Sequence, residues 1–180
     1  MITPLTLHDA LCDFIEEKIA NCYMLKSVDS KGREYLKPPQ VIRSGFLIPK
    51  SVRVKTSDSY ELEFSVEEEI PFILPRIDKV ENIKGERTSI VTFAVYFNLY
   101  DSGYDEQGNL VNDGSGYRDL WNLIEATRQA FWENLTIDSK YRLVEDFLEA
   151  EMLDEDTYPY WQGCLLTKWY VVFPQPKVNF

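Results

Sequence analysis

The side chains that most often carry enzyme chemistry are scarce in this sequence. Its single histidine, His8, falls in the first turn of a predicted helix, where an imidazole is usually a surface residue. A catalytic triad would have to be built from His8 and a cysteine or serine, and no pattern in the sequence supports one. The three cysteines, Cys12, Cys22 and Cys164, form no CxxC pair, which argues against a zinc site. We therefore predict no catalytic residue, no metal site and no cofactor.

Acidic and glycine-rich stretches give no stronger signal of chemistry. Residues 101–113 hold many oxygen ligands but do not follow the spacing of a calcium loop, so turn formation is the simpler interpretation. Glu149 with Glu151 is one of many pairs expected by chance among thirty acidic residues, and the run 145–156 is typical of a solvated face. The glycines of 114–116 precede a helix and are commonly a flexible entry rather than a phosphate cradle.

Composition limits the class of protein. The 180 residues are 44% hydrophobic, enough for one folded domain over 1–180, and no apolar run could span a bilayer. The net charge of −11 disfavours a nucleic-acid-binding face, which needs clustered Lys and Arg. The N-terminus has no secretion-signal pattern and the cysteine count is odd, so we expect an intracellular protein with reduced thiols.

Periodicity predicts the helices. An amphipathic helix capped by Thr6 runs to about Cys22, and residues 117–134 form a second helix. The buried stripes are predicted to be Leu7, Leu11, Phe14, Ile15 and Ile19 in the first helix, and Leu120, Leu123, Ile124, Thr127 and Phe131 in the second. The polar segment 26–37 is expected to be a loop or an exposed hairpin.

Alternation of apolar and polar residues predicts the strands. Residues 40–48, 60–66, 90–100 and 163–173 are expected strands, with 90–100 central in the sheet. Pro71 and Pro75 confine 70–77 to a sheet edge or an irregular segment. Tyr141 and Leu143 suggest another strand, while 145–156 suits helix and strand equally. The order of elements predicts an α+β fold: a mixed, mostly antiparallel β-sheet with two or three helices packed on one face.

Several segments, taken in order, resemble the tail terminator (tail completion) proteins of long-tailed bacteriophages, which are minor tail proteins of siphophages. The resemblance covers roughly residues 39–174 and leaves 1–38 outside it. The segments that carry it are Pro39-Gln40-Val41 with Gly45 and Pro49-Lys50, Ile70 to Arg76, Tyr100-Asp101, Gly116 to Leu120 with Leu123-Ile124-Glu125 and Arg128, and Tyr158 to Gly163 with Trp169.

The resemblance implies a structural protein without enzymatic activity. Such a subunit assembles as a ring, typically six-fold, on the last ring of the tail tube, ends tube growth and offers a surface to the head connector. It would act in the host cytoplasm during assembly and then in the tail or neck of the virion. Partners are then a second copy of the chain, the tail tube protein and the head connector protein, with no membrane and no specific nucleic-acid binding.

Two expectations concern the ring. Part of the negative charge is expected to line a channel through which DNA passes without sticking, and the loop 101–116 is expected to order on assembly. Candidate assembly-interface residues, chosen from exposure, composition and aromatic clustering, are Ile70, Phe72, Arg76, Tyr104, Tyr158, Tyr160 and Trp161.

Other functions remain open at this point. Within the same particle the chain could be a head-completion or connector protein, or a tail tube subunit, although short hairpins favour the terminator. From different classes, it could be an acidic inhibitor that mimics DNA charge, or a small enzyme with an unusual carboxylate site. The first needs carboxylates spaced over one surface, and the second needs a deep pocket with strongly perturbed acids.

Overall fold

The computed structural model describes residues 2–46, 50–56, 59–65, 70–84, 86–105, 107–111, 114–153 and 158–172, with the main chain alone for 50–65. In chain order the elements are α1 (Pro4–Lys18), the 3-10 helix η1 (Ala20–Cys22), β1 (Leu25–Val28), β2 (Glu34–Lys37), β3 (Gln40–Val41), β4 (Lys50–Thr56), β5 (Ser59–Ser65), β6 (Phe72–Asn82), β7 (Thr88–Tyr100), α2 (Ser115–Glu133), β8 (Thr136–Ile137), β9 (Tyr141–Met152) and β10 (Tyr160–Val172). No helix among the described residues is long and apolar enough to cross a membrane.

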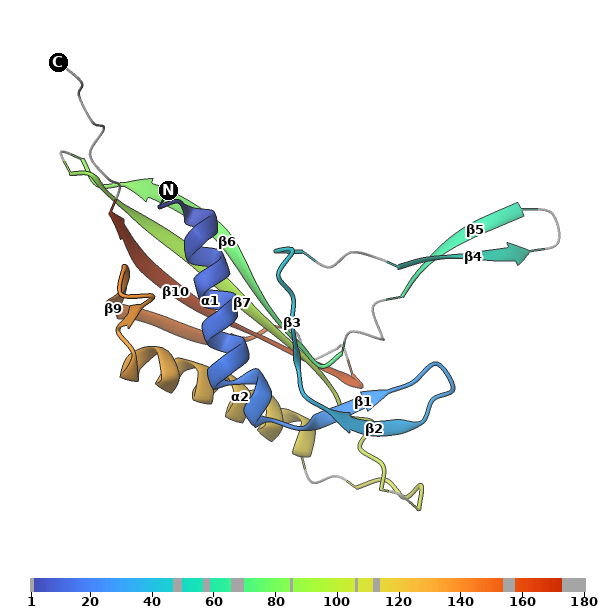
Figure 1. The fold of residues 1–180 in the computed structure, drawn as a ribbon. Helices are drawn as coiled ribbons and strands as arrows, with labels where there is room; N and C mark the ends of the chain where they lie inside the picture. Colours follow the sequence, from blue (N-terminus) through green and yellow to red (C-terminus); the bar gives the residue numbers. More distant parts are fainter. Residues whose placement is uncertain are drawn as a thin grey trace.

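A six-stranded sheet in the order β3-β6-β7-β10-β9-β8 forms the body of the protein. Every neighbouring pair is antiparallel except β3 and β6, which are parallel. Two hairpins, β1–β2 and β4–β5, form small sheets of their own (Figure 1). The α+β fold with a mixed, mostly antiparallel sheet is therefore confirmed, and β7 is central as predicted.

Both long helices pack on the same face of this sheet (Figure 1). The buried stripe of α1 includes Leu7, Leu11 and Ile15, each with no exposed surface. Burying each of these side chains contributes about 1.5–3 kcal/mol to folding. Between the helices, Phe14 stacks on Phe131 with ring centroids 5.6 Å apart, which joins α1 to α2.

Within the described part of the chain, the opposite face of the sheet carries no helix and has a small apolar cluster at one end. Ile42, Ile70, Phe72 and Leu74 are buried there. Tyr96, Tyr100 and Tyr160 pack against them from β7 and β10. Tyr160, the first residue of β10, thus contributes to packing, as aromatic side chains commonly do.

Helix α1 begins at a different residue from the one predicted. Its N-cap is Thr3, whose side chain accepts a hydrogen bond from the Thr6 amide at 3.2 Å, while Thr6 Oγ1 accepts one from the Thr3 amide at 2.9 Å. Both threonines belong to the capping box, and Pro4 occupies the first turn, where its missing amide hydrogen costs nothing. Thr6 is therefore the third residue of the helix, and the prediction that it is the cap was wrong.

Other local predictions have mixed outcomes. The segment 26–37 is a hairpin, and 145–152 continues the strand β9. The predicted strand 40–48 is shorter, because only Gln40 and Val41 join β6, and Gly45 has the left-handed φ of 71°. Residues 47–49 and the predicted turn 67–69 lie outside the described residues.

Candidate docking surface

The β1–β2 hairpin and the loop that follows β7 project beyond the same end of the six-stranded sheet (Figure 1). They are in direct contact, because Ser102 Oγ donates a hydrogen bond to the Glu34 carboxylate. A groove of about 940 Å³ lies between them, and its lining includes Tyr35 and Leu36 from β2 and Tyr104 from the loop. Two segments whose hydrogen-bonded residues are 68 positions apart in the sequence therefore form one surface.

Asp101, the first residue after β7, holds this surface to the sheet and to α2. Its carboxylate accepts hydrogen bonds from Lys26 Nζ at 2.7 Å, from the Gly103 amide at 3.2 Å and from Ser115 Oγ. Its amide donates to the carbonyl of Pro159 at 3.0 Å. Asp101 is 4% exposed, so its buried carboxylate connects the hairpin, the loop and the start of α2, and its amide adds a link to the residue before β10.

The same carboxylate also lies near the start of α2. The N-cap residue of this helix is Gly114, which has no side chain that could accept a bond from the first turn. The hydrogen bond from Ser115 holds the Asp101 carboxylate beside the N-terminus of α2. A negative charge at this position interacts favourably with the helix dipole.

Burial acts to raise the pKa of Asp101, but the hydrogen bonds from Lys26, Ser115 and Gly103 outweigh it and hold the pKa below its ordinary value. The carboxylate is consequently ionised at neutral pH and forms an ion pair with Lys26. A buried charge with several hydrogen-bond donors holds the surrounding segments in place, because removing either the carboxylate or a donor would leave its buried partner unpaired.

The loop beyond Asp101 has a hydrogen-bonded fold of its own. Asp105 Oδ1 accepts bonds from the amides of Gln107 at 3.0 Å and Asn109 at 2.8 Å, and these bonds lower the pKa of Asp105. Tyr104 and Leu110 pair as an isolated β-bridge. The loop thus presents both side chains from a short hairpin-like turn.

Large apolar side chains are exposed on these segments. We use the term docking surface for Tyr35, Leu36, Tyr104, Leu110 and Tyr158, which are between 44% and 68% exposed. Tyr158 joins this group because its hydroxyl donates to the Ser102 carbonyl at the base of the loop. Exposed apolar groups gathered on a fixed support are typical of protein–protein contact sites, and tyrosine is enriched at their energetic centres.

The interface residues that were predicted from the sequence lie in different parts of the structure. Tyr104 and Tyr158 are both on the docking surface. Ile70 and Phe72 are each 3% exposed and belong to the apolar cluster behind the sheet, as does the partly buried Tyr160. The remaining two lie elsewhere: Trp161 packs against Tyr117, and Arg76 is exposed on β6.

Sequence reasoning missed Tyr35, Leu36 and Asp101. The two β2 residues sit in a polar segment whose partner across the groove is distant in sequence. Asp101 had a usable signal, because an acidic residue directly follows the long predicted strand 90–100. Nothing in the sequence indicated that Lys26 would pair with Asp101.

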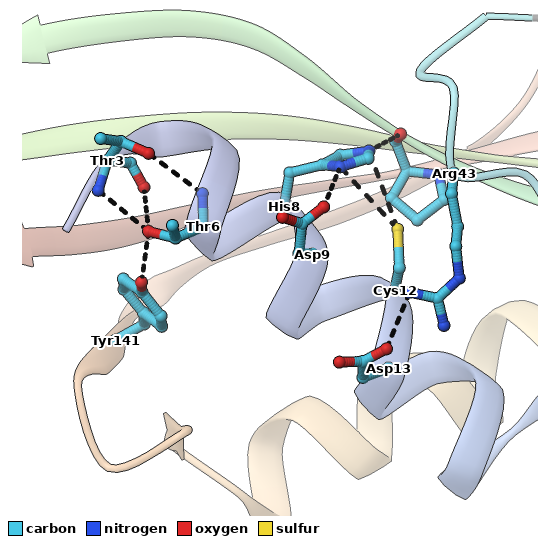
Figure 2. A network of polar contacts seen from close by, with 9 residues as sticks. Thr3, Thr6, His8, Asp9, Cys12, Asp13, Arg43 and Tyr141 are labelled. Carbon is cyan, nitrogen blue, oxygen red and sulfur yellow. Dashed lines mark hydrogen bonds and ion pairs between the residues drawn. The ribbon is translucent and has the colours of Figure 1, made fainter. Parts of the chain in front are cut away.

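His8 is buried, and the prediction that it is a surface residue was wrong. Its Nε2 lies 3.0 Å from the Pro75 carbonyl oxygen of β6, and it is 6% exposed (Figure 2). Cys12 Sγ lies 3.7 Å from the same nitrogen, and the buried Cys12 thiol has its pKa raised to about 11 by desolvation. Figure 2 also shows the Thr6 hydroxyl hydrogen-bonded to the Tyr141 hydroxyl at 2.7 Å. Polar contacts therefore join α1 to two strands of the sheet, β6 and β9.

Among the described residues, no three His, Cys, Asp or Glu side chains are grouped so that they could hold a metal ion. The polar contacts around His8 thus join elements of the fold. Comparison of the sequence with models of known protein families and with characterised proteins finds no match.

Proposed function

We propose that the protein is a structural tail protein of a long-tailed bacteriophage, which caps the tail tube as a ring, ends tube growth and provides the surface for head attachment. The docking surface is the observation that carries this proposal. An isolated subunit that exposes several tyrosines and leucines at one end needs a partner to cover them. In this proposal the protein catalyses no reaction, and its partners are further copies of itself, the tail tube protein and the head connector protein.

The segments that resemble the terminator family contact one another in the fold. Three of the segments that resemble the family lie far apart in sequence and meet beneath the docking surface. Asp101 bonds to the Pro159 carbonyl, and Tyr100 and Tyr160 have ring centroids 5.7 Å apart. Gly116 lies against the Trp161 ring. The segments that carry the resemblance therefore meet in one region of the fold.

The support beneath the surface fits a docking role. The Asp101 hydrogen bonds hold Gly103 and the hairpin to the sheet within a single chain, so less conformational entropy is lost there on binding. Ordering of the loop 101–116 on assembly stays a prediction. During assembly the protein would act in the host cytoplasm, and it would remain in the tail or neck of the particle.

The proposal is tested by binding to purified tail tubes and by joining of the capped tubes to heads. The double variant Tyr35→Ser/Tyr104→Ser removes two exposed aromatic groups. We expect its affinity for the tube, or the affinity of the capped tube for the head, to fall at least about tenfold, a change of about 1.4 kcal/mol. The matched control is Trp132→Ser, which removes an aromatic side chain that is 52% exposed at the far end of α2. Unchanged tube binding and unchanged head joining by the double variant would contradict the role of this surface, and a wild-type protein that binds no tube would contradict the proposed function.

A further inference from the structure

In the part of the chain that the structure describes, the two edges of the six-stranded sheet have no strand partner over most of their length. On one side, β3 pairs only with Phe72 and Ile73 of β6. On the other side, β8 pairs only with Tyr141 and Arg142 of β9, and one further bond joins Leu143 to Leu135. Among the described residues, β6 from Arg76 onward and β9 from 144 onward therefore have a strand partner on one side alone. Open edges are places where another chain can pack.

The edges differ in charge. Residues 144–152 of β9 carry four exposed acidic side chains and no basic one: Glu145, Asp146, Glu149 and Glu151. Glu145 pairs with Arg142, whereas the other three have no ion-pair partner within the described part of the chain. The edge formed by β6 and its turn, residues 76–87, holds four basic against three acidic side chains, although the whole chain has a net charge of −11.

These charges favour a contact between a β6 edge and a β9 edge over a contact between two β9 edges. Two β9 edges brought together across a two-fold axis would place carboxylates against carboxylates, which is unfavourable. A β6 edge beside a β9 edge places Arg76, which has no ion-pair partner among the described residues, near Glu149 and Glu151. Contact between two different surfaces of the same chain is heterologous, and repetition of such a contact closes into a ring when the rotation permits.

Strand direction agrees with this pairing. Along β6-β7-β10-β9 each strand is antiparallel to its neighbour, so β9 runs opposite to β6. A second copy in the same orientation therefore offers a β6 edge that is antiparallel to the β9 edge of the first copy. Both edges are also interrupted, by Pro75 and a register shift after Ile77 in β6, and by a register shift opposite Thr167 to Trp169 in β9. These interruptions limit backbone pairing, so side-chain contacts must provide most of the specificity.

We infer that the β6 edge of one copy packs beside the β9 edge of a second copy of this chain, with Arg76 facing Glu149 and Glu151. The inference rests on the proposed function, because this contact would be the subunit interface of the ring. It names the partner of each edge and disfavours a symmetric contact between two β9 edges.

Charge exchange tests the inference. Arg76→Glu and the pair Glu149→Arg/Glu151→Arg each place like charges at the contact, and each is expected to weaken self-association at least about tenfold. The triple variant that combines them restores opposite charges and is expected to recover association. An equimolar mixture of the two single-edge variants is also expected to associate, since each supplies the charge that the other lacks. All substituted side chains are exposed, so stability should change by no more than about 0.5 kcal/mol. The control is Lys31→Glu, an exposed charge reversal in the β1–β2 hairpin.

The measurements are sedimentation velocity of the free protein and carbodiimide cross-linking of the protein bound to tail tubes. A cross-link between Lys79 and an acidic residue of β9, formed between isotopically distinct chains, would support the contact. If the wild type caps tubes while the edge variants cap equally well and no such cross-link forms, the inference is wrong and the proposed function stands. If the wild type caps no tube, the proposed function is wrong, and the inference survives only if the free chains associate and respond to charge exchange.

Discussion

The carboxylate of Asp101 accepts a hydrogen bond from Ser115, fourteen positions further along the chain, and so closes the loop between β7 and α2. The same carboxylate pairs with Lys26 of the β1–β2 hairpin. One buried aspartate therefore determines how two exposed segments are presented next to each other. This relationship links the stability of the fold to the shape of the docking surface.

Replacing Asp101 with asparagine keeps its size and removes its charge. We expect the free energy of unfolding to fall by about 1–3 kcal/mol, because the hydrogen bonds from Lys26 and Ser115 lose their charged acceptor. Urea denaturation measures this change. Asp138→Asn serves as the control, since its ion pair with Lys140 is exposed and should contribute less than about 0.5 kcal/mol. Equal stability of wild type and Asp101→Asn would show that the buried pair contributes nothing.

The contribution of Asp101 should depend on pH. Its pKa in the folded protein lies below the ordinary value of 3.8, so the unfolded chain binds the proton first as the solution is acidified. The stability difference between wild type and Asp101→Asn should be constant above about pH 5 and shrink as the pH falls below about 4. A difference that grows on acidification would contradict the lowered pKa.

Gly116 is expected to tolerate no side chain. A Cβ atom at this position would lie 2.2 Å from Nε1 of Trp161, so the ring on β10 or the first turn of α2 must move. We expect Gly116→Ala to cost about 1–3 kcal/mol and to shift the tryptophan fluorescence, although alanine is the better helix former. In contrast, Asn122→Ala on the exposed side of α2 should leave the spectrum unchanged. Wild-type stability of Gly116→Ala would refute the close contact.

The three cysteines should differ in reactivity. Burial raises the pKa of Cys12 and of Cys164 to about 11, whereas Cys22 is exposed. With iodoacetamide at pH 8, mass spectrometry should find one modified cysteine per folded chain, Cys22, and three after denaturation. Rapid labelling of Cys12 in the native protein would mean that α1 separates from the sheet far more often than its packing suggests.

The bond between His8 and Pro75 is expected to stabilise the docking of α1 on β6. In the variant His8→Leu the buried Pro75 carbonyl has no donor from this side chain, and we expect a loss of about 1–3 kcal/mol in urea denaturation. Asp9→Ala changes an exposed neighbour and should cost far less. If both variants were equally stable, the hydrogen bond would be unimportant for folding.

Much of the fold could be predicted from periodicity, and the misses have identifiable physical causes. The stripe of α2 and the alternation in β7 are long and regular, so their type and burial were predicted correctly. The start of α1 was misplaced because Thr3 and Thr6 are both suitable caps, and only their reciprocal bonds identify Thr3. Residues 145–152 were ambiguous by pattern, and pairing with β10 makes them a strand.

The candidate site was predictable only in part. Tyr104 and Tyr158 were singled out by residue type and by the loop or turn in which they lie, and both are exposed on the docking surface. Ile70 and Phe72 have the same apolar character, but a sequence does not show that Ile42 and Leu74 bury them behind the sheet. The contribution of Tyr35 depends on a contact between β2 and the loop after β7, which no local pattern encodes.

The most direct test of the central claim is electron microscopy of particles assembled with and without this protein. We predict overlong or ragged tails that fail to join heads when the protein is absent, and tails of uniform length that join heads when it is added back. Tails of normal length that merely fail to join would place the protein on the head side of the neck. Particles that are unchanged by its removal would contradict a role in the tail altogether.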